Sequence, residues 1–190
     1  MHEEIAIGGF GGQGVLFIGR LLAEAAFLEG HEVVFMPSYG AEKRGGTVWC
    51  NVTISDDKIG ALFIKRPTAA IAMNTASLTR LESAMKPGSL LVINQSLVPT
   101  KTSRPDISAV YVPTSELATQ LGDSSAGNLV ALGALLASRQ VIPVSSVKKV
   151  LNSVMSGHQE RSEMNRRALN EGYHWAQQDP ASVHRVERKV

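Results

Sequence analysis

Residues 5–14 read IAIGGFGGQG, a short apolar run followed by a glycine-rich turn. The run predicts a buried strand over residues 3–7. Apolar side chains then recur every three or four residues, which predicts a helix over residues 15–28. A strand, a glycine turn and a helix N-terminus in succession bring backbone N–H groups together and add about half a positive charge. The stretch therefore predicts the first unit of an α/β fold and a place where an anion can be held.

The rest of the chain continues this alternation, which predicts a three-layer α/β/α sandwich with a mixed, mostly parallel sheet and a helical C-terminal region. One domain is expected over residues 1–190, with residues 180–190 as a mobile tail. Residues 31–36 are almost continuously apolar, which predicts a strand covered on both faces. Asp56-Asp57 separates two strand-like runs and predicts a β-hairpin. The other expected strands span residues 47–55, 58–64, 69–73, 89–94 and 109–112, and the expected helices 77–85, 115–121, 128–138, 143–155 and 158–178.

Composition excludes several classes of protein. A length of 190 residues and a hydrophobic share of 44% suit one domain with a sizeable core. The net charge of +2 is too small to indicate nucleic acid as a partner. Cys50 is the only cysteine, so it cannot form an internal disulfide or a cysteine-ligated zinc or iron–sulfur site, and we expect it in the core rather than as a nucleophile. No apolar run approaches the ~20 residues that cross a bilayer, and no signal-peptide pattern is seen. We expect a cytoplasmic protein that binds neither membrane nor metal.

The first glycine-rich turn satisfies the spacing G-x-G-x-x-G of dinucleotide-binding folds, in the right strand and helix context. That pattern also requires an acidic residue at the end of the second strand, where this chain has Phe35-Met36-Pro37. The missing acid argues against a nicotinamide or flavin site. Two interpretations remain. Either the turn serves only close packing of helix and strand, or Gly11, Gly12, Gln13 and Gly14 contact an anionic ligand.

The second glycine-rich segment, residues 37–46, reads PSYGAEKRGG and is less generic. Such a loop loses much conformational entropy on folding if it only connects two strands. Its candidate binding residues are Ser38, Tyr39, Glu42, Lys43 and Arg44. The planar guanidinium of Arg44 suits a phosphate or carboxylate, and Glu42 could orient it. A solvated loop with a surface ion pair, worth under about 1 kcal/mol, is the alternative.

The pattern Pro-Ser-Tyr-Gly-x-Glu-x-Arg-Gly-Gly, preceded by Gly-Gly-Gln-Gly, resembles the gamma subunit of the 2-oxoacid:ferredoxin oxidoreductases. That family includes the pyruvate, 2-oxoglutarate, branched-chain 2-oxoacid and indolepyruvate enzymes. The similarity extends to Asn94-Gln95-Ser96 and to Gly127-Asn128-Leu129-Val130, and so covers most of the first 140 residues. It implies a thiamin-diphosphate-dependent complex that oxidatively decarboxylates a 2-oxoacid to an acyl-CoA and reduces ferredoxin. The resemblance favours 2-oxoglutarate as the substrate, with pyruvate and branched-chain 2-oxoacids as alternatives.

The resemblance implies that this chain contributes only part of the reaction. Gly122-Asp123-Ser124 lacks the second glycine of a thiamin-site motif, and one cysteine cannot bind a cluster. Thiamin diphosphate, Mg²⁺ and the iron–sulfur clusters are therefore expected on alpha, beta and delta partner subunits, with coenzyme A as a shared substrate. No catalytic residue is assigned to this chain. The isolated chain could self-associate.

Lys43 and Arg44, with the backbone of the first turn, are expected to face the partner subunits near the mouth of the active site. There they would hold the acidic parts of coenzyme A or anchor the adjoining chain. Asn94 lies at the carboxyl end of a predicted strand, where it either contacts a ligand or caps a loop. Thr114 and Asn128 are expected as helix N-caps. A stand-alone nucleotide- or CoA-binding module and a purely architectural subunit are the competing hypotheses.

Overall fold

The computed structural model describes residues 1–39, 46–178 and 183–184. Within these ranges the strands form one seven-stranded sheet in the order β2-β3-β1-β4-β5-β6-β7. β1, β4, β5 and β6 are parallel neighbours, β3 is antiparallel to both β1 and β2, and β7 is antiparallel to β6. The predicted mixed, mostly parallel sheet is therefore confirmed. The strands are β1 His2–Phe10, β2 Glu32–Tyr39, β3 Thr47–Ser55, β4 Ala69–Ala72, β5 Leu90–Asn94, β6 Ser108–Val112 and β7 Val183–His184.

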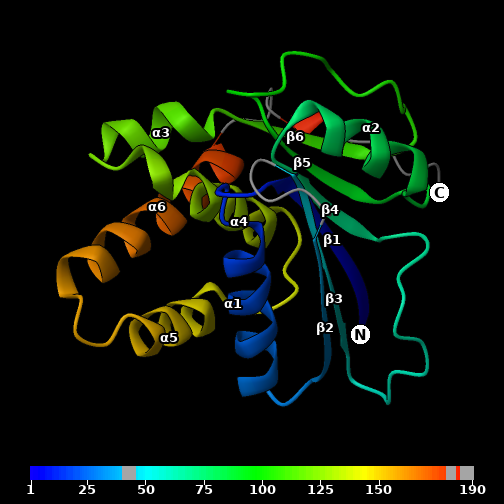
Figure 1. Ribbon diagram of the computed structural model, residues 1–190. Helices are drawn as coiled ribbons and strands as arrows, with labels where there is room; N and C mark the ends of the chain where they lie inside the picture. The colour runs from blue at the N-terminus through cyan, green and yellow to red at the C-terminus, as the bar shows by residue number, and fades with distance from the viewer. Residues whose placement is uncertain (40–45, 179–182, 185–190) are drawn as a thin grey trace.

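The helices cover the two faces of the sheet unequally (Figure 1). α1 and α4 pack directly on one face, with α5 and α6 packed against them, while α2 lies on the opposite face. Three layers result, as predicted, but one outer layer is much thinner than the other. The helices are α1 Val15–Leu28, α2 Thr75–Ala84, α3 Thr114–Gln120, α4 Gly127–Ser138, α5 Val144–Val154 and α6 Gln159–Gln178, with the 3-10 turn η1 at Ser124–Ala126.

The pleat of the strands divides the core in two. In β1, Ile5 and Ile7 enter the large cluster beneath α1 and α4, whereas Ala6 enters a smaller cluster beneath α2. Successive side chains of a strand point to opposite faces, so a continuously apolar strand can feed both clusters at once. The buried residues of the large cluster come from β1, β3 and β4–β6 as well as from α1 and α3–α6.

α4 and α6 cross so closely that glycine is required at the contact. A Cβ at Gly172 would lie 2.6 Å from the carbonyl carbon and 2.8 Å from the Cα of Val130, and it would overlap the Val130 carbonyl oxygen. Backbone atoms cannot move aside as a side chain can. On α4, a Cβ at Gly133 would in turn overlap the carbonyl oxygen of Leu169 on α6, so a glycine on each helix permits the close approach.

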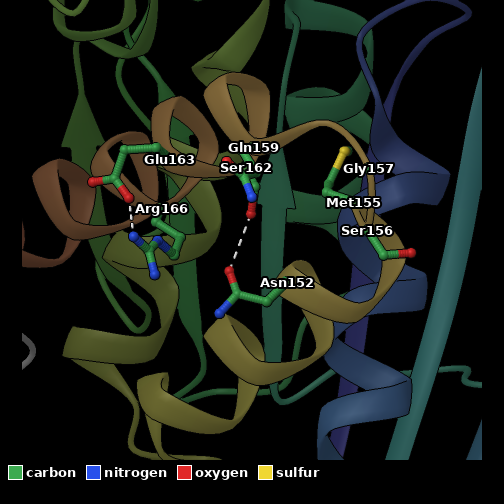
Figure 2. A pocket seen from close by; sticks show the side chains of 8 residues that line it. All are labelled: Asn152, Met155, Ser156, Gly157, Gln159, Ser162, Glu163 and Arg166. Atoms are coloured by element: carbon green, nitrogen blue, oxygen red, sulfur yellow. Dashed lines mark hydrogen bonds and ion pairs between the residues drawn. The ribbon is translucent and has the colours of Figure 1, made fainter.

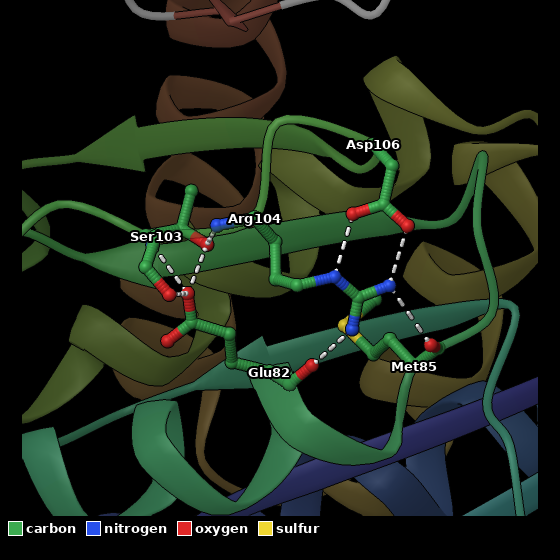
Figure 3. A network of polar contacts seen from close by, with 6 residues as sticks. Glu82, Met85, Ser103, Arg104 and Asp106 are labelled. Atoms are coloured by element: carbon green, nitrogen blue, oxygen red, sulfur yellow. Dashed lines mark hydrogen bonds and ion pairs between the residues drawn. The ribbon is translucent and has the colours of Figure 1, made fainter.

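Arg104 holds the end of α2 from a neighbouring loop (Figure 3). Its guanidinium donates to the backbone carbonyls of Glu82 at 2.7 Å and of Met85 at 3.3 Å, and it forms a two-bond ion pair with Asp106 at 2.6 and 2.7 Å. The carbonyls of the last turn have no partner within the helix, so these bonds supply one. The helix ends there and the chain turns toward β5.

The structure differs from three of the expectations about strands and tail. β2 is not covered on both faces but is an edge strand with half-buried and exposed residues. The run Lys58–Ile64 forms no strand, because β3 already pairs with β1 on one side and β2 on the other. The predicted hairpin around Asp56-Asp57 is therefore wrong, and the antiparallel partner of β3 across the loop is β2. Within the expected tail, Val183–His184 pairs with β6.

Candidate functional site

The two glycine-rich segments meet at the edge of the sheet where β1, β4, β5 and β6 end. β3 lies between β1 and β2, so the two segments do not follow adjacent strands. They still meet, because β3 begins at this same edge. The N–H of Gly11 donates to the carbonyl of Gly46, the residue just before β3, at 2.9 Å. In an open α/β sheet, ligands bind beyond the carboxyl ends of the strands, so this edge is the candidate site.

Gln13 folds back onto the turn and fixes its shape. Its Oε1 accepts from the N–H of Phe10 at 2.7 Å and from the Asn74 side-chain amide at 3.2 Å. Its Nε2 donates to the carbonyl of Met73 at 3.2 Å. Three of the hydrogen bonds that an amide side chain can form are thus made inside the protein. Gln13 ties the turn after β1 to the end of β4.

A chain of buried polar groups continues along the same edge. Asn94 at the end of β5 donates to the carbonyl of Met73 at 3.2 Å and accepts from the Thr114 hydroxyl at 2.6 Å. Asn94 and Thr114 are each 1% exposed. Thr114 is therefore not the N-cap of α3, which is Pro113; its hydroxyl is used by Asn94 instead. Together with Gln13 and Asn74, these groups link the ends of β1, β4, β5 and β6.

Gly14 begins α1 with a left-handed conformation, at φ 71°. A Cβ there would overlap the side-chain nitrogen of Asn128 and lie 3.0 Å from its Cγ. The Asn128 amide donates to the carbonyl of Gly14 at 3.4 Å, and its Oδ1 accepts from the N–H of Leu129 at 2.9 Å. Asn128 is therefore not the N-cap of α4, which is Ala126. It braces the first turn instead, a role that the sequence pattern gave no means to predict.

The outward side of the turn consists of main chain. Gly11 and Gly12 are exposed, and a Cβ at Gly12 would meet open space, although its φ of 96° favours glycine. The first turn of α1 carries neither a capping side chain nor an acidic residue. The N-terminal amides and the helix dipole of α1 are therefore not neutralised by a side chain of the helix itself. This arrangement suits an anion.

The second segment is described only at its two ends. Ser38 and Tyr39 end β2, and the Tyr39 side chain is 69% exposed. Ser38 faces the thinly covered side of the sheet, where it lines a cavity. Glu42, Lys43 and Arg44 lie outside the described residues.

Cys50 is a core side chain, as expected. Burial raises the pKa of its thiol to about 12, so the reactive thiolate is scarce near neutral pH. Its sulfur donates to the carbonyl of Val15 at 3.5 Å. The described residues contain no group of three or more His, Cys, Asp or Glu side chains that could hold a metal ion. In residues 1–39, 46–178 and 183–184, no helix is both long and apolar enough to cross a bilayer.

A separate cavity of about 510 Å³ lies between α5 and α6 (Figure 2). Its polar side chains are directed at one another: the Ser162 hydroxyl donates to Asn152 at 3.0 Å, and Arg166 pairs with Glu163. These internal pairs leave no charge directed at a ligand, so the cavity is not a candidate site.

The comparison with known proteins agrees with the family resemblance that the sequence motifs indicate. The pattern of the family described as pyruvate ferredoxin/flavodoxin oxidoreductase matches residues 4–175. The chain is 31% identical to the 2-oxoglutarate synthase subunit KorC of Methanocaldococcus jannaschii, over 94% of this chain and 96% of that subunit. It is 32% identical to the ketoisovalerate oxidoreductase subunit VorA of Methanothermobacter thermautotrophicus, over 92% of this chain. The chain spans only 36% of the length of VorA.

A solved structure shows the same fold. The gamma subunit of a keto/oxoacid ferredoxin oxidoreductase from Geobacter sulfurreducens matches with a TM-score of 0.79 and 29% sequence identity. The match covers 92% of this chain and 98% of that one. The similarity therefore extends over nearly the full length of the two sequences compared.

Proposed function

The chain belongs to the pyruvate ferredoxin/flavodoxin oxidoreductase family, and we propose that it acts as the gamma subunit of a 2-oxoacid:ferredoxin oxidoreductase. The observation that carries the proposal is the match, over nearly the full length of both chains, to the KorC subunit and to the Geobacter gamma subunit. The complex would oxidatively decarboxylate a 2-oxoacid, form an acyl-CoA and reduce ferredoxin. Family membership weighs against a stand-alone nucleotide- or CoA-binding module.

The role proposed for this chain is to present main-chain donors at the mouth of an active site housed by its neighbours. Gln13 and Asn94 use their amides to brace the turn and the strand ends, so we infer that they position the site rather than contact the ligand. The N–H groups of the turn around Gly12 and Gly14, with the α1 dipole, would attract a phosphate or carboxylate. Coenzyme A, which carries several phosphates, is the proposed ligand.

The segment from Ser38 to Arg44 would complete the site. Gly46, which follows the segment, accepts a hydrogen bond from the N–H of Gly11 in the first turn, and this contact supports the proposal that the segment lies near the α1 N-terminus. We propose that Lys43 and Arg44 add full positive charges to the partial charges of the amides, with Glu42 orienting Arg44. Tyr39 would contribute its hydroxyl from the end of β2, whereas Ser38 faces the cavity on the α2 side of the sheet.

The cofactors of the reaction are proposed to sit on alpha, beta and delta partner subunits. The Asp123 carboxylate accepts from the Ser125 N–H at 2.9 Å and from its hydroxyl at 2.6 Å. It therefore caps a local turn, and this does not fit a diphosphate-bound Mg²⁺. Thiamin diphosphate and the iron–sulfur clusters would supply the decarboxylation and electron-transfer chemistry, and no step of that chemistry is assigned to this chain.

We propose 2-oxoglutarate as the substrate of the complex. The proposal is supported by the similarity to KorC, whose name assigns it to a 2-oxoglutarate synthase and whose length matches this chain. The similarity to VorA, named as a ketoisovalerate oxidoreductase subunit, makes a branched-chain 2-oxoacid the next candidate. Pyruvate is the third.

Reconstitution tests both the assignment and the site. The chain is co-expressed with candidate thiamin-binding and cluster-binding subunits, and ferredoxin reduction and acyl-CoA formation are measured with each 2-oxoacid. An Arg44→Ala complex should assemble normally and show a raised KM for coenzyme A. Arg167→Ala, an exposed position on α6, is the matched control and should behave as wild type. An unchanged KM with Arg44→Ala would remove that residue from the site. Turnover by the purified chain alone would contradict the assignment itself.

A further inference from the structure

A cavity of about 440 Å³ lies on the thinly covered face of the sheet, between α2 and the strands β1, β2 and β3. On the opposite face α1 covers this part of the sheet and α5 packs against α1, whereas here α2 and the segment between β3 and β4 border it (Figure 1). Ser38 is exposed and Asn51 is half-buried, although both lie on the sheet. The lining includes Ser38, Trp49, Asn51, Phe63, Lys65 and Arg80.

The charged groups among the described residues of this cavity all carry the same sign. Arg80 and Lys65 line it, and none of the described lining residues is an aspartate or a glutamate. Among the described residues, neither cation forms an ion pair. The Arg80 guanidinium lies 4.4 Å from the centre of the Trp49 ring, a contact that orients the cation without neutralising it. The cavity therefore favours the binding of a negatively charged group.

The edge of the cavity is apolar. Phe63 is 71% exposed and its neighbour Leu62 is 55% exposed, both on the segment between β3 and β4. Burying the apolar surface that these two side chains leave in water would be favourable. Such exposure next to charged groups is typical of a protein interface, in which an apolar centre is bordered by polar contacts.

We propose that this cavity is the docking site for an acidic segment of a partner subunit, with a carboxylate between Arg80 and Lys65 and an apolar side chain against Phe63. The inference rests on the proposed function, because it requires that this chain works within a complex. A free small anion would satisfy the two cations but would leave Phe63 and Leu62 in water. A protein segment covers both, so the charge and the exposed apolar surface together favour it.

The test uses the reconstituted complex. The affinity of this chain for the assembled partner subunits is measured by titration at two salt concentrations. Arg80→Gln should weaken binding by about tenfold or more and Lys65→Gln by about threefold, and both should reduce the salt dependence. Phe63→Ser should weaken binding with little change in salt dependence. Lys149→Gln, an exposed cation on α5 across the sheet, is the matched control and should bind as wild type.

Three other outcomes overturn the inference. Arg80→Gln and Lys65→Gln complexes that assemble as wild type would show that this face does not dock a partner. Normal assembly with a raised KM for coenzyme A or the 2-oxoacid would assign the cavity to a small anion instead. If the isolated chain forms dimers and Arg80→Gln abolishes them, the cavity binds a second copy of this chain instead. If the wild-type chain fails to bind any candidate partner, the proposed function fails rather than this site.

Discussion

Replacing Gly14 with alanine tests the brace between the first turn and α4. Two costs are expected. A non-glycine residue in the left-handed conformation costs about 1–2 kcal/mol. The new Cβ also overlaps the Asn128 amide, and forcing a packed side chain aside costs about 1–3 kcal/mol. Gly14→Ala should therefore lower the free energy of unfolding by about 2–5 kcal/mol.

The cause can be isolated with a second substitution. In the wild-type background, Asn128→Ala removes bonds of 3.4 and 2.9 Å and should cost about 1 kcal/mol or less. In the Gly14→Ala background, the same change removes the overlap and should raise stability by about 1–2 kcal/mol. The sign of the Asn128→Ala effect is therefore expected to reverse between the two backgrounds.

Urea unfolding of the purified chain, followed by circular dichroism for the four proteins of this cycle, measures the effect. Equal m-values would show that the compactness of the unfolded state is unchanged. If Asn128→Ala destabilises both backgrounds by the same amount, within about 0.5 kcal/mol, the two residues are independent and the brace does not exist as described.

Four further changes probe the fold. Gly172→Ala should cost at least about 2 kcal/mol in urea unfolding, because its Cβ meets the backbone of α4; Gly60→Ala, which meets nothing within 4 Å, is the control. Arg104→Ala should cost about 1–2 kcal/mol by freeing the last carbonyls of α2, and a wild-type urea midpoint would contradict this. The hydrogen bond from Arg104 lowers the pKa of Asp106 below its usual 3.8, so its stabilisation is present at neutral pH and is lost as the pH falls below about 4; Asp106→Asn should flatten that acid limb in melting curves. Cys50 should react with a thiol reagent at pH 8 orders of magnitude more slowly in the native chain than in urea, and comparable rates would show that it is accessible.

Local sequence signals predict most of the fold. α1 spans Val15–Leu28 as expected, since a glycine turn precedes it and its apolar spacing is regular. β3 spans Thr47–Ser55 as expected, but its partners could not be deduced. The run Lys58–Ile64 resembles a strand, and only the three-dimensional arrangement shows that β1 and β2 already occupy both edges of β3. Which strands pair depends on the arrangement of the whole sheet, so the periodicity of one segment does not predict its partner.

In the candidate site, too, the features that depend on local sequence could be predicted and those that depend on distant contacts could not. The glycine turn and Asn94 are recognisable from their places at the ends of predicted strands, and the structure brings them to one edge. The assignments of Thr114 and Asn128 as N-caps are wrong, because each side chain has a distant partner: Asn94 for Thr114 and Gly14 for Asn128. The polar chain through Gln13 and Asn74 was missed for the same reason. The spacing of neighbouring residues does not predict hydrogen bonds between side chains that are far apart in sequence.

A site built from peptide amides has a particular tolerance of mutation. A lysine or serine that holds a ligand can be lost by a single codon change, whereas every residue except proline retains its N–H. Replacements on the solvent side of the turn at Gly11–Gly12 would leave the donors in place wherever the backbone conformation survives. Inactivation should instead arise at the concealed contacts, such as the close approach of Asn128 to Gly14, where any added side chain would overlap. A survey of random mutants should therefore find loss of function clustered inside the turn rather than on its exposed side.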